Sequence, residues 1–139
     1  MVVIFYLKKL EIPFAFVLGG MLYMLIEILW RGYTHWSMGI CSGICFAGIY
    51  LFEKYRGSMS IFFKCIFGAF FITLNEFITG CIVNLALGWD VWDYSKTPYN
   101  LLGQICLPFS LVWFLLCIPA FLLARVIIRI YAKTPIPQK

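Results

Sequence analysis

Acidic side chains within apolar stretches are the residues of this sequence whose types and positions suggest chemistry. Glu27 and Glu76 each lie inside a long apolar stretch, and Asp90 and Asp93 follow the second of these. A charge near the centre of a bilayer costs about 2.5–3.5 kcal/mol on insertion scales, so such a carboxyl group faces protein or a wet cavity, or it takes up a proton. Groups of this kind bind ions, solutes or lipid head groups, or they form internal ion pairs.

Helical periodicity places the two glutamates on polar stripes. At about 100° per residue, one arc contains Gly20, Tyr23, Glu27 and Arg31, and another contains Thr73, Glu76, Gly80 and Asn84. Arg31 follows Glu27 at the i, i+4 spacing of an ion pair, and it could also neutralise Glu76 or Asp93. We therefore expect the two stripes to share one polar interior.

Most of the remaining polar candidates come from two aromatic segments between the apolar stretches, 30–36 and 89–100, and Gln104 lies at the start of the fourth stretch. Aromatic residues are typical of membrane interfaces, but the polar residues among them indicate more than an anchor. We predict a binding site at the outer face of the membrane. Its candidate residues are Glu27, Arg31, His35, Glu76, Asn84, Asp93, Tyr94, Ser95, Asn100 and Gln104.

Metal and cofactor chemistry find little support in the sequence. His35 is the only histidine, and none of the six cysteines belongs to a Cys-x-x-Cys pair. Cys41 and Cys45 are the soft ligands nearest to His35, and Cys106 could lie at a similar depth. We expect the cysteines to be small apolar helix residues, and we predict no metal and no cofactor.

Four apolar stretches must position these side chains. Hydrophobic residues make up 63% of the chain and charged residues 12%, whereas soluble domains carry about 25% charge. The mean hydropathy is +0.94. A bilayer crossing needs about 20 apolar residues, and helices satisfy their own backbone in lipid.

We predict an all-α integral membrane protein whose residues 1–139 form a single four-helix transmembrane bundle. The predicted helices span about residues 12–30, 37–53, 61–87 and 104–130, and residues 131–139 form a flexible cytoplasmic tail.

The basic residues predict the orientation of the bundle. With the N-terminus inside, only Arg31 and Lys96 of the eleven lysines and arginines fall in outer loops. Cytoplasmic loops carry such an excess of positive charge, so both termini are predicted to be cytoplasmic in a multi-pass protein of the plasma membrane. The basic residues form no stripe of the kind that binds nucleic acid, so we predict the lipid bilayer and no nucleic acid as a partner.

Three further features of the sequence predict how the helices pack and bend. Each half of the chain has an outward helix with a glutamate, an aromatic loop and a return helix, which suggests two similar helical hairpins. Gly39 and Gly43 form a Gly-x-x-x-Gly motif, which we attribute to packing within the chain rather than to dimerisation. Pro108 and Pro119 predict kinks in the fourth helix.

Several motifs together are distinctive. They are Glu-Ile-Leu-Trp-Arg-Gly-Tyr-Thr-His-Trp-Ser-Met at 27–38, Glu-Phe-Ile-Thr-Gly at 76–80 with Asn84, Trp-Asp-Tyr-Ser at 92–95, and Asn-Leu-Leu-Gly-Gln-Ile-Cys at 100–106. Over roughly residues 15 to 125, the chain resembles the small bacterial four-helix membrane proteins of the CmpB type, the ABC-transporter type IV family. The resemblance implies a permease subunit that is served by an ATPase.

Three functions remain open at this point. The first is a transport subunit with Glu27, Arg31, Glu76 and Asp93 along the solute path. The second is a structural or assembly subunit whose polar network only holds the bundle together. The third is a lipid-head-group enzyme of the outer leaflet, in which Asp93, His35 and Glu76 transfer protons and Arg31 holds a phosphate.

The sequence also bears on the partners of the chain. A chain without a Gly-x-x-x-x-Gly-Lys-Ser/Thr loop does not hydrolyse ATP alone, and four helices are few for transport. We therefore expect a homo-oligomer or a partner membrane or ATPase subunit.

Overall fold

The computed structural model describes residues 10–133, and most of them belong to four long helices. In chain order these are α2 (Glu11–Arg31), α3 (Trp36–Arg56), α4 (Ile61–Gly80) with the π-helical turn η1 (Cys81–Ala86), and α5 (Leu107–Lys133). Two short antiparallel strands, β1 (Asn100–Leu101) and β2 (Ile105–Cys106), form a hairpin directly before α5. The four helices are long and apolar enough to cross a membrane, which confirms the predicted fold class.

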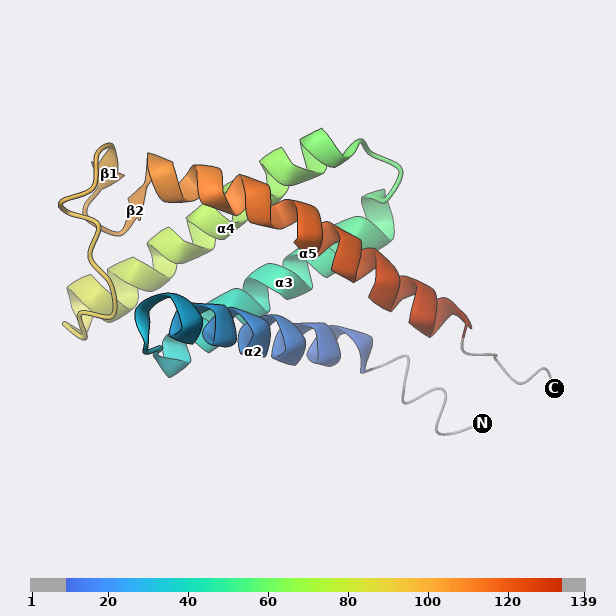
Figure 1. The fold of residues 1–139 in the computed structure, drawn as a ribbon, viewed down its shortest axis with the longest axis horizontal. Coiled ribbons are helices and arrows are strands. Elements are labelled where there is room, and N and C mark those ends of the chain that lie inside the picture. The colour runs from blue at the N-terminus through green and yellow to red at the C-terminus, as the bar shows by residue number, and fades with distance from the viewer. Residues whose placement is uncertain (1–9, 134–139) are drawn as a thin grey trace.

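The helices form two hairpins that lie against each other (Figure 1). Helix α2 packs on α3, helix α4 packs on α5, and α3 also contacts both α4 and α5. The segments 32–35 and 87–106 lie together at one end of the bundle, which we call the loop end (Figure 1). The start of α2, the turn 57–60 and the end of α5 lie at the other, which we call the terminal end. The similarity of the two hairpins in sequence stays a prediction.

Glycines allow the close approach of α2 and α3. A Cβ atom added to Gly20 would lie 2.6 Å from the carbonyl oxygen of Gly39, and one added to Gly43 would lie 2.8 Å from that of Phe16. Real Cβ atoms do not approach backbone oxygens this closely, so both helices need glycine at these points. The Gly-x-x-x-Gly motif therefore serves a contact within the chain, as the sequence predicted.

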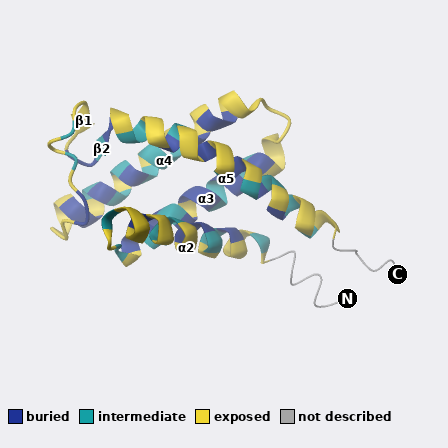
Figure 2. Ribbon diagram, viewed as in Figure 1, coloured by how far each residue is buried: buried dark blue, intermediate teal, exposed yellow. Residues whose placement is uncertain are grey.

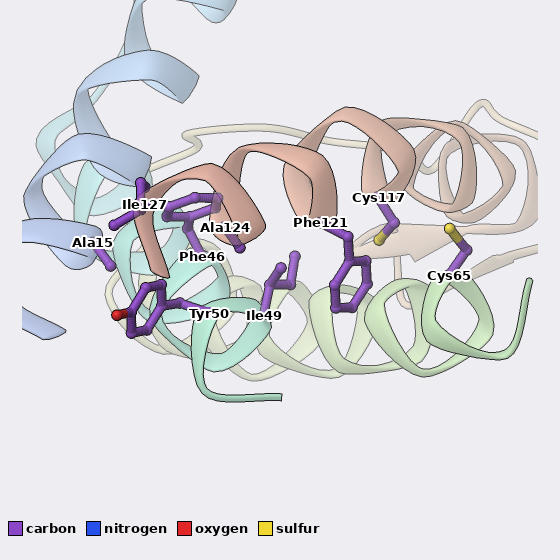
Figure 3. Close-up of a cluster of buried hydrophobic side chains, with 9 residues drawn as sticks. All are labelled: Ala15, Phe46, Ile49, Tyr50, Cys65, Cys117, Phe121, Ala124 and Ile127. Atoms are coloured by element: carbon purple, nitrogen blue, oxygen red, sulfur yellow. The ribbon is translucent and has the colours of Figure 1, made fainter. Parts of the chain in front are cut away.

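The main apolar core fills the middle and the terminal half of the bundle. Figure 3 shows its side chains reaching inward from all four helices, with Cys65 of α4 facing Cys117 of α5. It consists of Ala15, Phe46, Ile49, Tyr50, Cys65, Cys117, Phe121, Ala124 and Ile127. The outward faces of the helices are exposed and carry large apolar side chains (Figure 2). An apolar surface of this extent is suited to lipid and not to water.

The helix bounds differ from the predicted ones where the chain enters and leaves the bundle. The fourth helix begins at Leu107 and not near residue 104, because the β1–β2 hairpin takes up the residues before it. Its end at Lys133 places residues 131–133 in helix and not in a tail. Residues 134–139 of the predicted tail, together with Lys8 and Lys9, lie outside the described residues.

The two prolines of the fourth stretch have different positions. Pro108 lies in the first turn of α5, where the missing N–H would have no intrahelical partner, so the predicted kink at this residue is wrong. Pro119 lies inside the helix, where it removes a backbone hydrogen bond.

Candidate functional site

Glu27 and Arg31 form an ion pair in the last turns of α2, at the loop end of the bundle. Nη2 of Arg31 lies 2.6 Å from Oε1 of the buried Glu27, and the Thr34 hydroxyl donates a hydrogen bond to the other carboxylate oxygen. Helix α2 stops here because Gly32 adopts a left-handed φ of 82° and its N–H caps the carbonyl of Ile28. Arg31 also donates to the carbonyl of Val91, 3.1 Å away, so the pair fastens the long loop 87–106 to α2.

The carboxylate of Glu76 lies between α4, α5 and the long loop. Its Oε1 accepts a hydrogen bond of 2.9 Å from the hydroxyl of Tyr94, and its Oε2 accepts one of 2.9 Å from the indole Nε1 of Trp113. Glu76 is 3% exposed. Burial, together with the Glu76 carboxylate, raises the pKa of Tyr94 well above its usual range, so this hydroxyl remains a donor. Glu76 thus accepts hydrogen bonds from two neutral groups. Among the described residues, no cationic side chain forms an ion pair with it.

A third group of polar residues anchors the long loop to the end of α4. Nδ2 of Asn84 donates to Oε1 of Gln104 at 2.8 Å, and Oδ1 of Asn84 accepts from the backbone N–H of Val91 at 2.7 Å. The indole of Trp92 donates to the Gln104 carbonyl at 2.9 Å. Asn84 belongs to the π-helical turn η1, and Gln104 lies in the turn between β1 and β2.

Asp93, Ser95 and Asn100 form a fourth group on the surface of the loop. The backbone N–H and the hydroxyl of Ser95 each donate to the Asp93 carboxylate at 2.8 Å. These hydrogen bonds lower the pKa of Asp93. Asn100 donates to the carbonyl of Thr97 at 2.9 Å and accepts from the N–H of Gly103 at 3.1 Å. The contacts of this group lie within the loop and describe a structural turn.

His35 caps α3. Its Nδ1 accepts from the backbone N–H of Ser37 at 3.2 Å and lies 2.7 Å from the Ser37 hydroxyl. Its ring packs against those of Trp36 and Trp89, with centroids 5.4 and 5.5 Å away, and the two indoles also contact each other. These contacts explain the histidine as a helix cap in an aromatic cluster.

The ten predicted residues therefore form separate hydrogen-bonded groups. Arg31 pairs with Glu27, as its spacing predicted, and the described contacts do not join it to Glu76 or Asp93. Tyr23 of the first stripe and Glu76 of the second line the same cavity, whereas the carboxylates of Glu27 and Glu76 have different hydrogen-bond partners. The shared polar interior therefore stays a prediction. Glu76 is the predicted site residue that also lines a cavity.

That cavity lies between the helices beneath the long loop and has a volume of about 230 Å³. Its lining is apolar except toward the loop end, where Tyr23, Cys41, Ser42, Glu76 and Trp113 contribute. Farther toward the terminal end the lining comes from apolar residues. They include Gly19, Phe46, Ile49, Ile72 and Leu123.

The cavity opens sideways between α2 and α5. Leu22 and Ile26 of α2 line it while 39% and 50% exposed, and Leu116 of α5 lines it while 37% exposed. These residues lie well inside two helices that are long enough to cross a membrane. The opening therefore lies within the apolar, membrane-spanning part of the two helices and not at the long loop.

Sequence reasoning missed two features. Trp113 is the one tryptophan outside the two loop segments, and an indole N–H inside an apolar stretch was a signal that it needed a partner. At the terminal end, Glu53 accepts from the fully buried Lys64 at 2.6 Å and from Arg125 at 2.8 Å. Opposite charges that flank neighbouring apolar stretches were the available signal for this ion pair cluster.

Comparison with known proteins identifies the family of this chain. A family model described as "Putative ABC-transporter type IV" matches residues 14–137. No curated protein and no solved structure matches the chain.

Proposed function

We propose that this chain, which belongs to the family described as "Putative ABC-transporter type IV", is a transport subunit whose solute occupies the cavity between α2 and α5. The chain is a multi-pass membrane protein by its four apolar helices. In the proposed orientation it lies in the plasma membrane with both termini in the cytoplasm and the long loop outside. An ATPase subunit supplies the energy, and a second copy or another membrane subunit completes the path.

The observation that carries this proposal is the position of Glu76. Three acidic residues are buried in the described part of the chain, and Glu27 and Glu53 each pair with a basic side chain. Glu76 lies at the polar end of the cavity with hydrogen bonds from neutral donors alone. Intramembrane acids without a cation mark solute, ion or proton paths.

The remaining predicted residues have a supporting role in this proposal. The pair Glu27 and Arg31 and the pair Asn84 and Gln104 hold the long loop over the cavity. Asp93, with Ser95 and Asn100, shapes the outer surface of that loop. Solute then meets Glu76 from the bilayer side, beneath the loop.

The test is transport in proteoliposomes. The tagged chain is purified with its co-purifying ATPase subunit, and ATP-dependent movement is measured for three fluorescent amphiphiles, one cationic, one neutral and one anionic. We expect movement of at least one probe and a loss of about tenfold or more in Glu76→Gln. No movement of any probe, or an unchanged rate in Glu76→Gln, would contradict the proposal.

Thr73→Val is the matched control for that variant. Thr73 lies on the same helix and donates a hydrogen bond of 3.1 Å to Ser110 of α5 without lining the cavity. Its loss weakens a contact between helices by about 0.6–2 kcal/mol and leaves the proposed path intact. The rate of Thr73→Val should therefore equal that of the wild type.

A structural subunit is the second candidate, and one observation favours it. The polar side chains of the loop end are hydrogen-bonded to one another or to backbone, which is the pattern of a network that holds a bundle together. In that case Glu76→Gln lowers the thermal unfolding midpoint without any effect on the movement of a solute. Measuring both quantities on the same preparation separates the two functions.

A further inference from the structure

We infer that the cavity between α2 and α5 binds a lipophilic ammonium ion, whose charged head lies against Glu76 and whose apolar body extends toward the terminal end. The inference rests on the proposed function for its biological meaning, because it names the class of solute. It depends on three features of the cavity, which are its charge, its aromatic lining and its opening.

Charge is the first feature. The carboxylate of Glu76 is 3% exposed, and the described residues supply it with no cation. Its two hydrogen-bond donors are the uncharged Tyr94 and Trp113. A carboxylate has about four lone-pair positions, so two donors leave it able to accept a cationic group from the cavity. A bound cation would give Glu76 the counter-charge that Glu27 and Glu53 obtain from the chain.

The aromatic lining is the second feature, and it is independent of the first. Tyr23 and Trp113 both line the cavity at the same end as Glu76, and their ring centroids lie 5.9 Å apart at an interplanar angle of 53°. Paired aromatic rings beside a negative group attract ammonium ions through the ring quadrupole, and Trp is the most effective ring. The same arrangement offers nothing to an anionic head.

The opening and the apolar lining define the rest of the ligand. The volume of about 230 Å³ exceeds the 150 Å³ or so of an engineered apolar cavity that holds benzene, and it lies below the usual size of about 300–1,000 Å³ for a drug site. It therefore accommodates the head and part of a chain or ring. The remainder of the ligand lies between Leu22 and Leu116, in the opening toward lipid.

The binding test uses three probes with one tail and different heads: octyltrimethylammonium, octanol and octanoate. Each is titrated calorimetrically into wild-type protein in nanodiscs, and empty nanodiscs give its partition into lipid. We expect octyltrimethylammonium to bind about tenfold more tightly than the other two, and Glu76→Gln to abolish this preference. Equal binding of all three probes, no binding of any, or a preference that persists in Glu76→Gln would overturn the inference.

A second variant covers the case in which Glu76→Gln does not fold. Leu116→Trp places a larger side chain in the opening and leaves Glu76 in place. It should weaken octyltrimethylammonium about tenfold, and undiminished binding in this variant would overturn the inference. Selective binding of the ammonium probe without movement of any probe in proteoliposomes would contradict the transport function alone. Transport without selective binding would contradict the ligand class alone.

Discussion

The indole Nε1 of Trp113 lies 2.9 Å from Oε2 of Glu76, although 37 residues separate the two in the sequence. This hydrogen bond joins α4 to α5 near the loop end and sets the orientation of a buried carboxylate. Tyr94 holds the other oxygen from the long loop. The carboxylate is thus fixed at one end of an apolar cavity, and that placement underlies both the proposed function and the proposed ligand.

Removal of the indole donor should destabilise the bundle. Trp113→Phe keeps an aromatic ring but loses the hydrogen bond to a buried carboxylate, and bonds to charged groups contribute about 1.5–3 kcal/mol. We expect a lower thermal unfolding midpoint in detergent. Trp30→Phe is the control, because Trp30 is 83% exposed and its replacement should change the stability by less than about 0.5 kcal/mol. Equal midpoints for the two variants would show that the Glu76 contact does not stabilise the fold.

Lys64→Met should be strongly destabilising. Lys64 is fully buried and donates to Glu53 at 2.6 Å and to the carbonyl of Gly57 at 2.7 Å. Breaking a buried ion pair on one side costs about 3–5 kcal/mol. The double variant Lys64→Met, Glu53→Gln removes both charges and should recover part of the loss. The unfolding free energies of the single and double variants measure this, and additive losses would argue against coupling.

The turn at Asp93 should weaken in acid. Hydrogen bonds from Ser95 lower the folded-state pKa of Asp93 below the ordinary value of 3.8. A depressed carboxyl pKa stabilises the turn above pH 3.8, and this contribution is lost as the pH falls through the lower folded-state pKa. NMR titration of the carboxyl carbon measures the shift. In Ser95→Ala the pKa should rise toward 3.8, and identical titration of both proteins would contradict the assignment.

The orientation of the bundle can be measured by cysteine labelling in intact cells. Lys96 lies in the exposed long loop and Ser58 in the exposed turn between α3 and α4. A membrane-impermeant maleimide should label Lys96→Cys and not Ser58→Cys, because basic residues favour the cytoplasmic side. The wild type, whose buried or partly buried cysteines remain, gives the background. Labelling of Ser58→Cys alone would reverse the topology.

The sequence predicted the helices and one of the polar contacts because both depend on local periodicity. Apolar stretches of sufficient length defined the four crossings, and the i, i+4 spacing of Glu27 and Arg31 predicted their ion pair. The partners of Glu76 were not predictable in this way. Tyr94 reaches Glu76 because the long loop folds back over the bundle, and Trp113 reaches it because α5 packs on α4.

Gln104 shows why the loop end was harder to predict than the crossings. It was assigned to the start of the fourth helix, but it lies in the β1–β2 turn with its side chain on Asn84. Non-local hydrogen bonds and two consecutive left-handed residues, Leu102 and Gly103, define this conformation. The cavity likewise depends on the spacing of α2 and α5, which are far apart in the sequence. No residue pattern within one helix predicts that spacing.

The central claim, that solute enters the cavity from lipid between α2 and α5, is tested most directly by blocking the opening. Leu116 lines the cavity, whereas Val112, one turn earlier on α5, is 42% exposed and does not. The measurement compares the initial rates of ATP-dependent probe movement in proteoliposomes that contain Leu116→Trp or Val112→Trp. We predict a decrease of about tenfold for Leu116→Trp and a rate equal to that of the wild type for Val112→Trp. Equal rates in the two variants would contradict the claim.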